Sequence, residues 1–220
     1  MDWHVLQILW ASRRVILGGI ETTLALAAGG LVIGLVVAIP LATAGAFGTL
    51  TLRRLANLYV FVLRGVPLLV TMLFLFFGLG AVWGAIPASL AAIVAMGLYG
   101  GAYLTEIFRG ALISIPQAQL DAARAIGLRL WSRIALVIAP QALPRALPSC
   151  VNVAVDMVKA STLVAALGVG DLLMTGQEIA MRSLLIPEIY LFLWLAYLAI
   201  NLGLSAFGRW LEGRLRHVVV

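Results

Sequence analysis

The chain has 220 residues, of which 63% are hydrophobic and only 11% are charged. Charged residues make up about 25% of ordinary soluble domains, so this composition indicates an integral membrane protein. The net charge of +6 does not indicate a nucleic-acid partner, because there is no basic stripe with interleaved aromatic residues. The single cysteine, Cys150, excludes an internal disulfide and a cysteine-based metal site.

Apolar segments long enough to cross a bilayer follow one another along the chain, since a spanning helix needs about 20 residues. Residues 22–51 contain no charge, and residues 55–81 contain only Arg64. A turn at 84–87 ends the second segment. We therefore predict one all-α membrane domain over residues 1–220. Its five expected spans lie at about 18–41, 56–80, 88–111, 143–167 and 189–208.

The fourth span is the hardest to detect, because Arg145, Asp156 and Lys159 interrupt it. It is needed to bring the arginine-rich connections to one side of the membrane. With five spans and the N-terminus outside, that side carries Arg53, Arg54, Arg109, Arg124, Arg129, Arg133, Arg209, Arg214 and Arg216. The positive-inside rule makes it the cytoplasm and places the C-terminus there. Arg13 and Arg14 disagree, and residues 1–17 are expected to be retained, as an interfacial helix.

Two pairs of glycines are spaced four residues apart inside the first and third expected spans. They are Gly30 with Gly34, and Gly97 with Gly101. Small residues at this spacing let two helices approach closely. We expect a contact within one subunit, with a dimer contact as the alternative.

A polar insert at about 112–140 separates the third and fourth spans. It contains Asp121-Ala122-Ala123, three residues, Gly127, nine residues, and then Val137-Ile138-Ala139-Pro140. A segment with a carboxylate and several arginines cannot lie in hydrocarbon, so it should be a structured cytoplasmic loop.

This spacing resembles the E-A-A, three residues, G, nine residues, I-x-L-P signature of the permease subunits of bacterial ABC importers. Asp121, Val137 and Ala139 replace the signature's Glu, Ile and Leu with residues of the same type. Other segments resemble the branch that imports amino acids. They are Arg64–Leu69, Gly101–Gly110, Pro140–Leu143, Lys159–Leu163 and Gly168–Leu173. Together the similar segments cover roughly residues 18–208.

The resemblance implies the type I permease fold of ABC importers in a bacterial inner membrane. It implies that Asp121, Ala122, Ala123 and Gly127 belong to a coupling helix that docks into the ATPase. The implied partners are cytoplasmic ATPase subunits that hold ATP and magnesium, a second permease that is identical or paralogous, and an extracytoplasmic solute-binding protein. The implied substrate is a polar amino acid or an opine, moved by alternating access. We expect this chain itself to bind no cofactor, metal or nucleic acid.

Lys159 is the only lysine, and it lies in an otherwise apolar segment. An unpaired charge there costs at least about 2.5–3.5 kcal/mol, so it needs a partner or a water-filled cavity. One interpretation is a local pair with Asp156, three residues earlier. The other is a contact for the carboxylate of a substrate, which the resemblance favours.

Glu106 has the same two interpretations, a local pair with Arg109 or a substrate contact. The resemblance implies that Glu106 binds the substrate's amino group, so that Glu106 and Lys159 receive the two ends of a zwitterion. Ser161 and Thr162 are expected either to add hydroxyl contacts or to bond to their own backbone. Arg64 is expected at an inner gate or at the headgroups, and Asp156 is expected in the same gate or pathway. Two residues depart from the amino-acid branch, Ala160 where it has an acid and Tyr99 where it has Asn.

The sequence shows no Walker A pattern, nucleophile elbow or H-E-x-x-H, and His4 and His217 are too far apart to suggest a metal site. We therefore expect no enzymatic activity. Two other functions stay open, an ion-gradient-driven secondary transporter and a membrane scaffold that transports nothing. The absence of an inverted repeat disfavours the first. The second would leave Glu106 and Lys159 as structural pairs.

Overall fold

The structure, a computed structural model, describes residues 3–215, so the expectations for Arg216 and His217 lie outside the described residues. Within these residues the structure consists of helices and short connections without any strand, which confirms the all-α prediction. The longer helices are α1 (Trp3–Ala11), α2 (Arg13–Phe47), α3 (Leu50–Gly65), α6 (Ala88–Ile113), α7 (Gln117–Ala125), α9 (Ala139–Ala160), α10 (Leu172–Ser183) and α11 (Ile186–Leu215). The shorter pieces are α4 (Leu68–Leu73), η1 (Phe74–Leu79), α5 (Gly80–Trp83), α8 (Leu130–Arg133), η2 (Ile134–Ile138) and η3 (Ser161–Leu167).

Four helical segments of residues 3–215 are long and apolar enough to cross a bilayer. They are Arg13–Phe47, Ala88–Ile113, Leu130–Leu167 and Ile186–Arg214. Each contains one expected span, at 18–41, 88–111, 143–167 and 189–208. The charge-interrupted fourth span is therefore part of a helical segment, and Pro144 and Pro148 both lie inside its helix α9.

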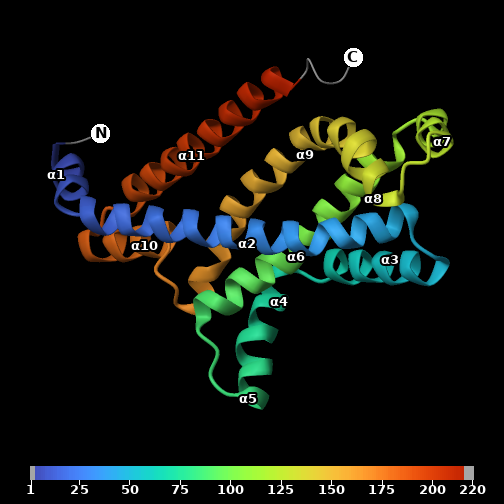
Figure 1. Cartoon of the computed structure of the whole chain (residues 1–220). Helices are drawn as coiled ribbons and strands as arrows, with labels where there is room; N and C mark the ends of the chain where they lie inside the picture. Colours follow the sequence, from blue (N-terminus) through green and yellow to red (C-terminus); the bar gives the residue numbers. More distant parts are fainter. Residues whose placement is uncertain (1–2, 216–220) are drawn as a thin grey trace.

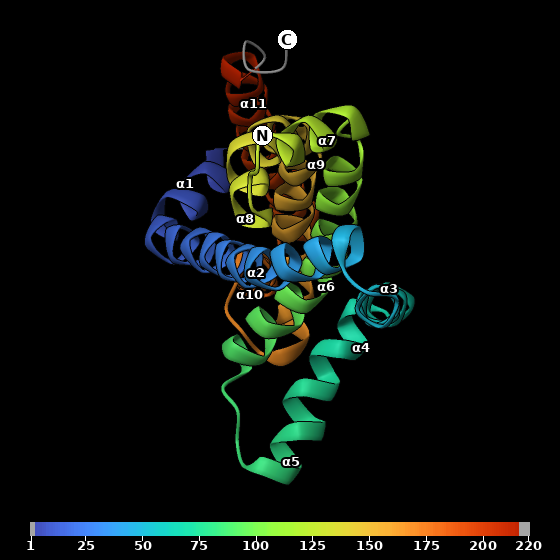
Figure 2. The same cartoon turned by 45° about the vertical axis from the view of Figure 1, so that its right-hand side comes forward.

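The second expected span, at 56–80, is not one straight helix. Helix α3 and the segment Leu68–Val82 meet at an angle of 100°. Val66, at φ −99° and ψ 132°, is extended, as expected for a residue before proline, and Pro67 has no N–H to continue the helix. Beyond the bend, α4, η1 and α5 project away from the other helices (Figure 2). The break places Arg64 beside a corner of the chain.

Helices α2 and α6 form the centre of the molecule and cross at the paired glycines. A Cβ atom added to Gly34 would lie 3.1 Å from the amide nitrogen of Gly101, and one added to Gly97 would lie 2.5 Å from Ile33 Cγ2. Side chains larger than hydrogen would hold the two helices apart. The expectation of a contact within one subunit is confirmed.

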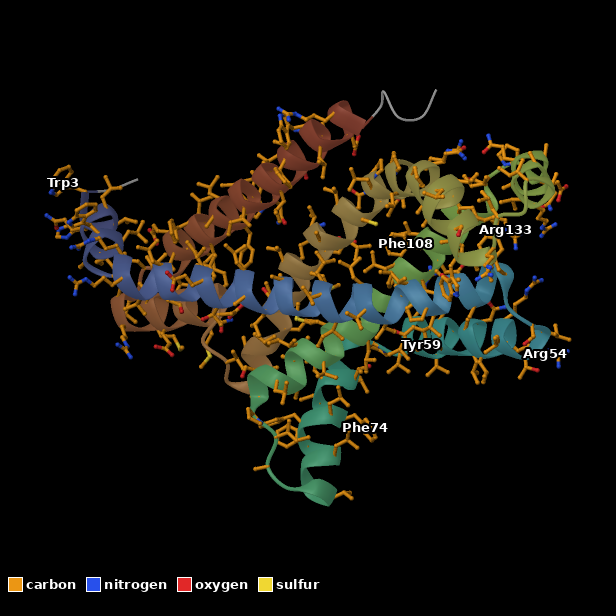
Figure 3. The ribbon with its side chains drawn as sticks, viewed as in Figure 1. Trp3, Arg54, Tyr59, Phe74, Phe108 and Arg133 are labelled. Atoms are coloured by element: carbon orange, nitrogen blue, oxygen red, sulfur yellow. The ribbon has the colours of Figure 1, made fainter. Side chains whose placement is uncertain are left out.

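Helix α3 returns alongside the second half of α2 and also packs on α6 (Figure 1). The hydroxyl of Tyr59 on α3 donates a hydrogen bond of 2.6 Å to the carbonyl of Leu98 on α6 (Figure 3). Helices α1 and α10 lie at one end of the molecule, and α7 and α8 lie at the other (Figure 1). The long helices therefore separate a polar insert at one end from the connection between α9 and α11 at the other.

Candidate functional site

A cavity of about 630 Å³ lies beside the corner where α3 ends. It is lined by Asn57, Val60, Phe61, Arg64 and Gly65 from α3, and by Tyr103, Glu106 and Arg109 from α6. The close packing of α3 on α6 positions both walls. The cavity thus brings together Glu106 and Arg64, two residues that the sequence singles out separately.

Glu106 forms the local ion pair that is the alternative to a substrate contact. Its Oε1 accepts a 3.0 Å hydrogen bond from Arg109 Nε, and its Oε2 accepts a second bond from the same guanidinium. Both side chains keep about a third of their surface exposed. A carboxylate has about four lone-pair positions, so Glu106 can hold Arg109 and still accept a further hydrogen bond from the cavity.

Arg64 lies against an aromatic ring instead of pointing away from the helices. Its guanidinium carbon is 4.7 Å from the centroid of the Tyr103 ring, within the range of a cation–π contact. This contact keeps a cation on the wall that Glu106 shares.

A second cavity, of about 230 Å³, shares Tyr103 with the first. It is lined by Leu68, Tyr99, Tyr103, Val153, Asp156, Met157, Ala160 and Leu163. The hydroxyl of Tyr99 donates to the hydroxyl of Tyr103 at 3.1 Å. Tyr103 therefore lines both cavities, and Tyr99 contacts it from the second.

Lys159 does not line either of these cavities. Its Nζ lies 3.1 Å from Asp156 Oδ1, and the two side chains are 60% and 62% exposed. The structure thus contains the local pair that is one of the two interpretations of Lys159. Asp156, which was expected in the pathway, lines the second cavity.

Ser161 and Thr162 both bond to their own backbone. Ser161 is fully buried and donates to the Val158 carbonyl at 2.8 Å, while Thr162 donates to the Lys159 carbonyl at 2.7 Å. Neither hydroxyl lines the two cavities. Of the two expectations for Ser161 and Thr162, the structure therefore shows the hydrogen bonds to their own backbone.

The polar insert forms a short helix, α7, at the end of the molecule opposite α10. Asp121 accepts hydrogen bonds from Gln117 and Arg124, Ala122 is exposed, and Ala123 is buried. After the helix, Gly127 has φ +79°. The Gly127 N–H donates to the Arg124 carbonyl at 2.9 Å, and the Leu128 N–H donates to the Ala123 carbonyl at 3.1 Å. This pair of bonds is a Schellman cap, which needs a left-handed residue where Gly127 lies.

Tyr103 and Asn57 line the first cavity although the sequence alone did not single them out. Tyr103 lies three residues before Glu106, so both side chains share one face of α6. That spacing could have found Tyr103. Asn57 could not have been found, because its place in the cavity depends on the packing of α3 on α6, which are distant in sequence.

A family model described as "binding-protein-dependent transport system inner membrane component" matches residues 30–217. The probable amino-acid ABC transporter permease protein PatM of Vibrio harveyi is 32% identical over 209 residues, 94% of each chain. The glutamine transport system permease protein GlnP of Escherichia coli is 34% identical over 217 residues, 98% of each chain.

Two solved structures have the same fold. A crystal structure of an amino acid ABC transporter with histidines matches with a TM-score of 0.86 and 28% identity, covering 97% of this chain and 100% of that one. The MetNI methionine ABC transporter in an inward-facing conformation matches with a TM-score of 0.80 and 18% identity, covering 93% and 98%. The second match shows the fold alone. Because the family model covers most of the chain, the protein belongs to the family of binding-protein-dependent transport system inner membrane components, the permease subunits of ABC transporters.

Proposed function

We propose that this permease subunit imports an amino acid, and that its substrate passes through the cavity between α3 and α6. The observation that carries the proposal is the presence of Glu106, Arg64 and Tyr103 on one 630 Å³ cavity. A zwitterionic amino acid presents one ammonium and one carboxylate group. Glu106 accepts hydrogen bonds from the ammonium, and Arg64 donates to the carboxylate.

The printed names of PatM and GlnP support an amino acid as the substrate. The arrangement of charges also favours a small zwitterion, because Arg64 and the Glu106 carboxylate line one cavity, and Arg109, which lines it too, is paired with Glu106. Lys159 remains a second candidate for the carboxylate. Its pair with Asp156 is exposed beside the second cavity, where a substrate leaving the first cavity would meet it.

We further propose that α7 is the coupling helix. Asp121 and the exposed Ala122 would face a cytoplasmic ATPase subunit that holds ATP and magnesium, while the buried Ala123 anchors the helix to this chain. The complete importer would contain a second permease, a pair of ATPase subunits and an extracytoplasmic binding protein. In this arrangement the chain catalyses no reaction itself. ATPase closure would move α7 and the spans joined to it.

The arginine distribution supports an orientation with the N-terminus outside and the C-terminus in the cytoplasm. Arg53, Arg54, Arg124, Arg129 and Arg133 all belong to α3, α7, α8 or their connections, at the end of the molecule away from α10. That end is then the cytoplasmic one. Arg13 and Arg14, in the first turn of α2, fall on the opposite side.

The test is uptake of labelled amino acids into proteoliposomes that contain the whole importer with its binding protein. Glu106→Gln and Arg64→Gln should each reduce transport, because loss of a charged hydrogen bond of about 1.5–3 kcal/mol corresponds to roughly ten- to a hundredfold weaker binding. The matched control is Glu178→Gln, which removes a carboxylate from an exposed ion pair with Arg182 on α10.

Uptake should require ATP inside the vesicles and should survive an ionophore that collapses ion gradients. Uptake driven by an ion gradient without ATP would show a secondary transporter instead. Normal transport by well-folded Glu106→Gln and Arg64→Gln variants would show that these charges are structural.

A further inference from the structure

A third cavity, of about 470 Å³, lies at the end of the molecule that holds α7 and α8. Arg53, Arg124 and Arg133 line it, and none of its lining residues is acidic. Apolar walls come from the end of α2, the end of α6 and the start of α8, through Ala46, Phe47, Leu112, Ile113 and Leu130. A cavity with three guanidinium groups and apolar walls needs a ligand that is both anionic and partly apolar.

The three arginines differ in how far the protein already satisfies them. Arg53 Nε donates to the Gly48 carbonyl at 3.0 Å, and Arg124 Nη1 donates to Asp121 at 3.0 Å. Arg133 Nε is buried and has no hydrogen-bond partner in the structure. A buried donor without a partner costs about 1–3 kcal/mol, so Arg133 is the arginine of the three that the protein satisfies least.

The position of the cavity selects among anionic ligands. Its walls include the last residues of α2 and α6, two of the segments that cross the bilayer, so the cavity lies at the depth of the lipid headgroups. Arg133 lies on α8 beside the end of α2 (Figure 3). Next to it, Trp131 is 75% exposed. Tryptophan side chains favour the headgroup region of a bilayer, and basic cavities between helix ends bind anionic headgroups.

We propose that this cavity binds the phosphate group of an anionic phospholipid, with Arg133 as its main donor. That the lipid belongs to the cytoplasmic leaflet rests on the proposed function, because the cavity adjoins the coupling helix. Gln117, Leu120 and Arg124 of α7 and Leu130 and Arg133 of α8 all line it. A bound headgroup therefore joins α7 and α8 to the ends of α2 and α6 and makes the position of the coupling helix sensitive to the lipid.

The test measures lipids retained by the purified transporter complex in native mass spectrometry, without nucleotide or substrate. We expect one phosphatidylglycerol per copy of this chain to stay bound. Under the same conditions a diacylglycerol, which lacks the phosphate, should be lost. Arg133→Gln should weaken that binding by at least about tenfold, the effect of losing one charged hydrogen bond. Arg133→Lys, which keeps the charge, should retain part of it.

The matched control is Arg129→Gln. Arg129 lies four residues before Arg133, is exposed and does not line the cavity, so this variant removes the same charge outside the proposed site. It should bind phosphatidylglycerol like the unmodified protein. Equal weakening in the Arg129→Gln and Arg133→Gln variants would show diffuse attraction and overturn the proposal. A competition arm uses inorganic phosphate, and full displacement of the lipid by millimolar phosphate would assign the cavity to the free ion.

A carboxylate of the ATPase is the remaining occupant to exclude. If Arg133→Gln releases the ATPase from the complex and leaves phosphatidylglycerol binding unchanged, the cavity receives the ATPase and the lipid assignment is wrong. None of these measurements requires transport. Failure of the lipid proposal is therefore distinguishable from failure of the proposed amino-acid import, which the uptake assay tests.

Discussion

Tyr103 lines both cavities of the candidate site and contacts one further lining residue of each. Its ring faces the Arg64 guanidinium, and its hydroxyl accepts the bond from Tyr99. On the proposed pathway, a substrate moving from one cavity to the other would pass Tyr103. The side chain would then have two functions, holding a cation in the first cavity and lining the way to the second.

Substitutions at Tyr103 can separate these two functions. Tyr103→Phe keeps the ring beneath Arg64 and should leave transport nearly unchanged. Tyr103→Leu removes the cation–π contact, worth about 0.5–2 kcal/mol, and should weaken apparent substrate affinity by about two- to thirtyfold. The measurement is uptake over a range of substrate concentrations. Equal loss in the Phe and Leu variants would show that the hydroxyl bond to Tyr99 is the important contact.

Asp171 is a buried carboxylate in the connection between η3 and α10. Its Oδ1 accepts a 2.9 Å hydrogen bond from the Met174 N–H and caps α10, and its Oδ2 accepts a bond from the Tyr197 hydroxyl at 3.3 Å. Asp171→Ala removes the cap of α10 and one hydrogen-bond acceptor of the Tyr197 hydroxyl, so it should destabilise the protein by about 1–3 kcal/mol. Thermal unfolding of the purified complex measures this, with the exposed Glu178→Ala as control.

The pH dependence of the stability gives a second test of Asp171. Burial raises the pKa of Asp171 above its ordinary value. The folded state then holds this proton more tightly than the unfolded state, so stability falls as pH rises from about 4 through the raised pKa. Asp171→Asn, which cannot ionise, should lack that fall and keep the cap to Met174. A fall of the same size in both proteins would assign it to other groups.

The contact of α2 with α6 depends on residues that have no side chain. An alanine at Gly97 would place its Cβ 2.6 Å from Ile33 Cβ, an atom close to the backbone that cannot move aside. Gly97→Ala should therefore lower the stability of the purified subunit by about 1–3 kcal/mol. Gly110→Ala is the matched control on the same helix, because nothing lies within 4 Å of its added Cβ. Similar stability of the two variants would show that α2 and α6 move apart at little cost.

The end of α7 depends on the backbone conformation of Gly127 and not on space around it. A Cβ there meets nothing within 4 Å, but φ is +79°. Gly127→Val should distort the Schellman cap at a cost of about 1–2 kcal/mol and uncouple ATP hydrolysis from uptake. Gly127→Asn, which tolerates the left-handed conformation, should remain coupled. ATPase stimulation by the loaded binding protein measures coupling, and normal stimulation in the Val variant would contradict this assignment.

The sequence predicts most elements of the fold because the bilayer imposes simple rules on it. Long charge-poor runs identify the first, third and fifth spans, and the glycine spacing identifies the contact of α2 with α6. Val66 and Pro67 cause the bend after α3, but the sequence did not predict it. Hydropathy gives the length of an apolar segment and not the angle between the two helices that form it. For the same reason the sequence could not place Asn57 or Arg64 opposite Glu106.

The candidate sites are predictable only where the contact is local. The pairs Glu106 with Arg109 and Asp156 with Lys159 follow from a three-residue spacing on one helix. The burial of Asp171 and the arginine-lined cavity at α8 each depend on three or more elements that are distant in sequence. A count of charges in the connections gives the side of the membrane but not which arginines share one cavity.

The proposed orientation of the whole molecule is testable by thiol labelling in intact cells. In a variant with Cys150→Ala, single cysteines at Thr49 and Ile126 should resist an impermeant reagent added outside. Thr49 comes directly before α3 and Ile126 directly after α7, both at the arginine-rich end. Ile126 is 76% exposed, so protection there reflects its side of the membrane and not burial within the chain. A cysteine at Met181, 66% exposed on α10, should react from outside. After the membrane is permeabilised, all three cysteines should react. Labelling of Ile126→Cys before that step would show the opposite orientation, with α7 out of reach of a cytoplasmic ATPase.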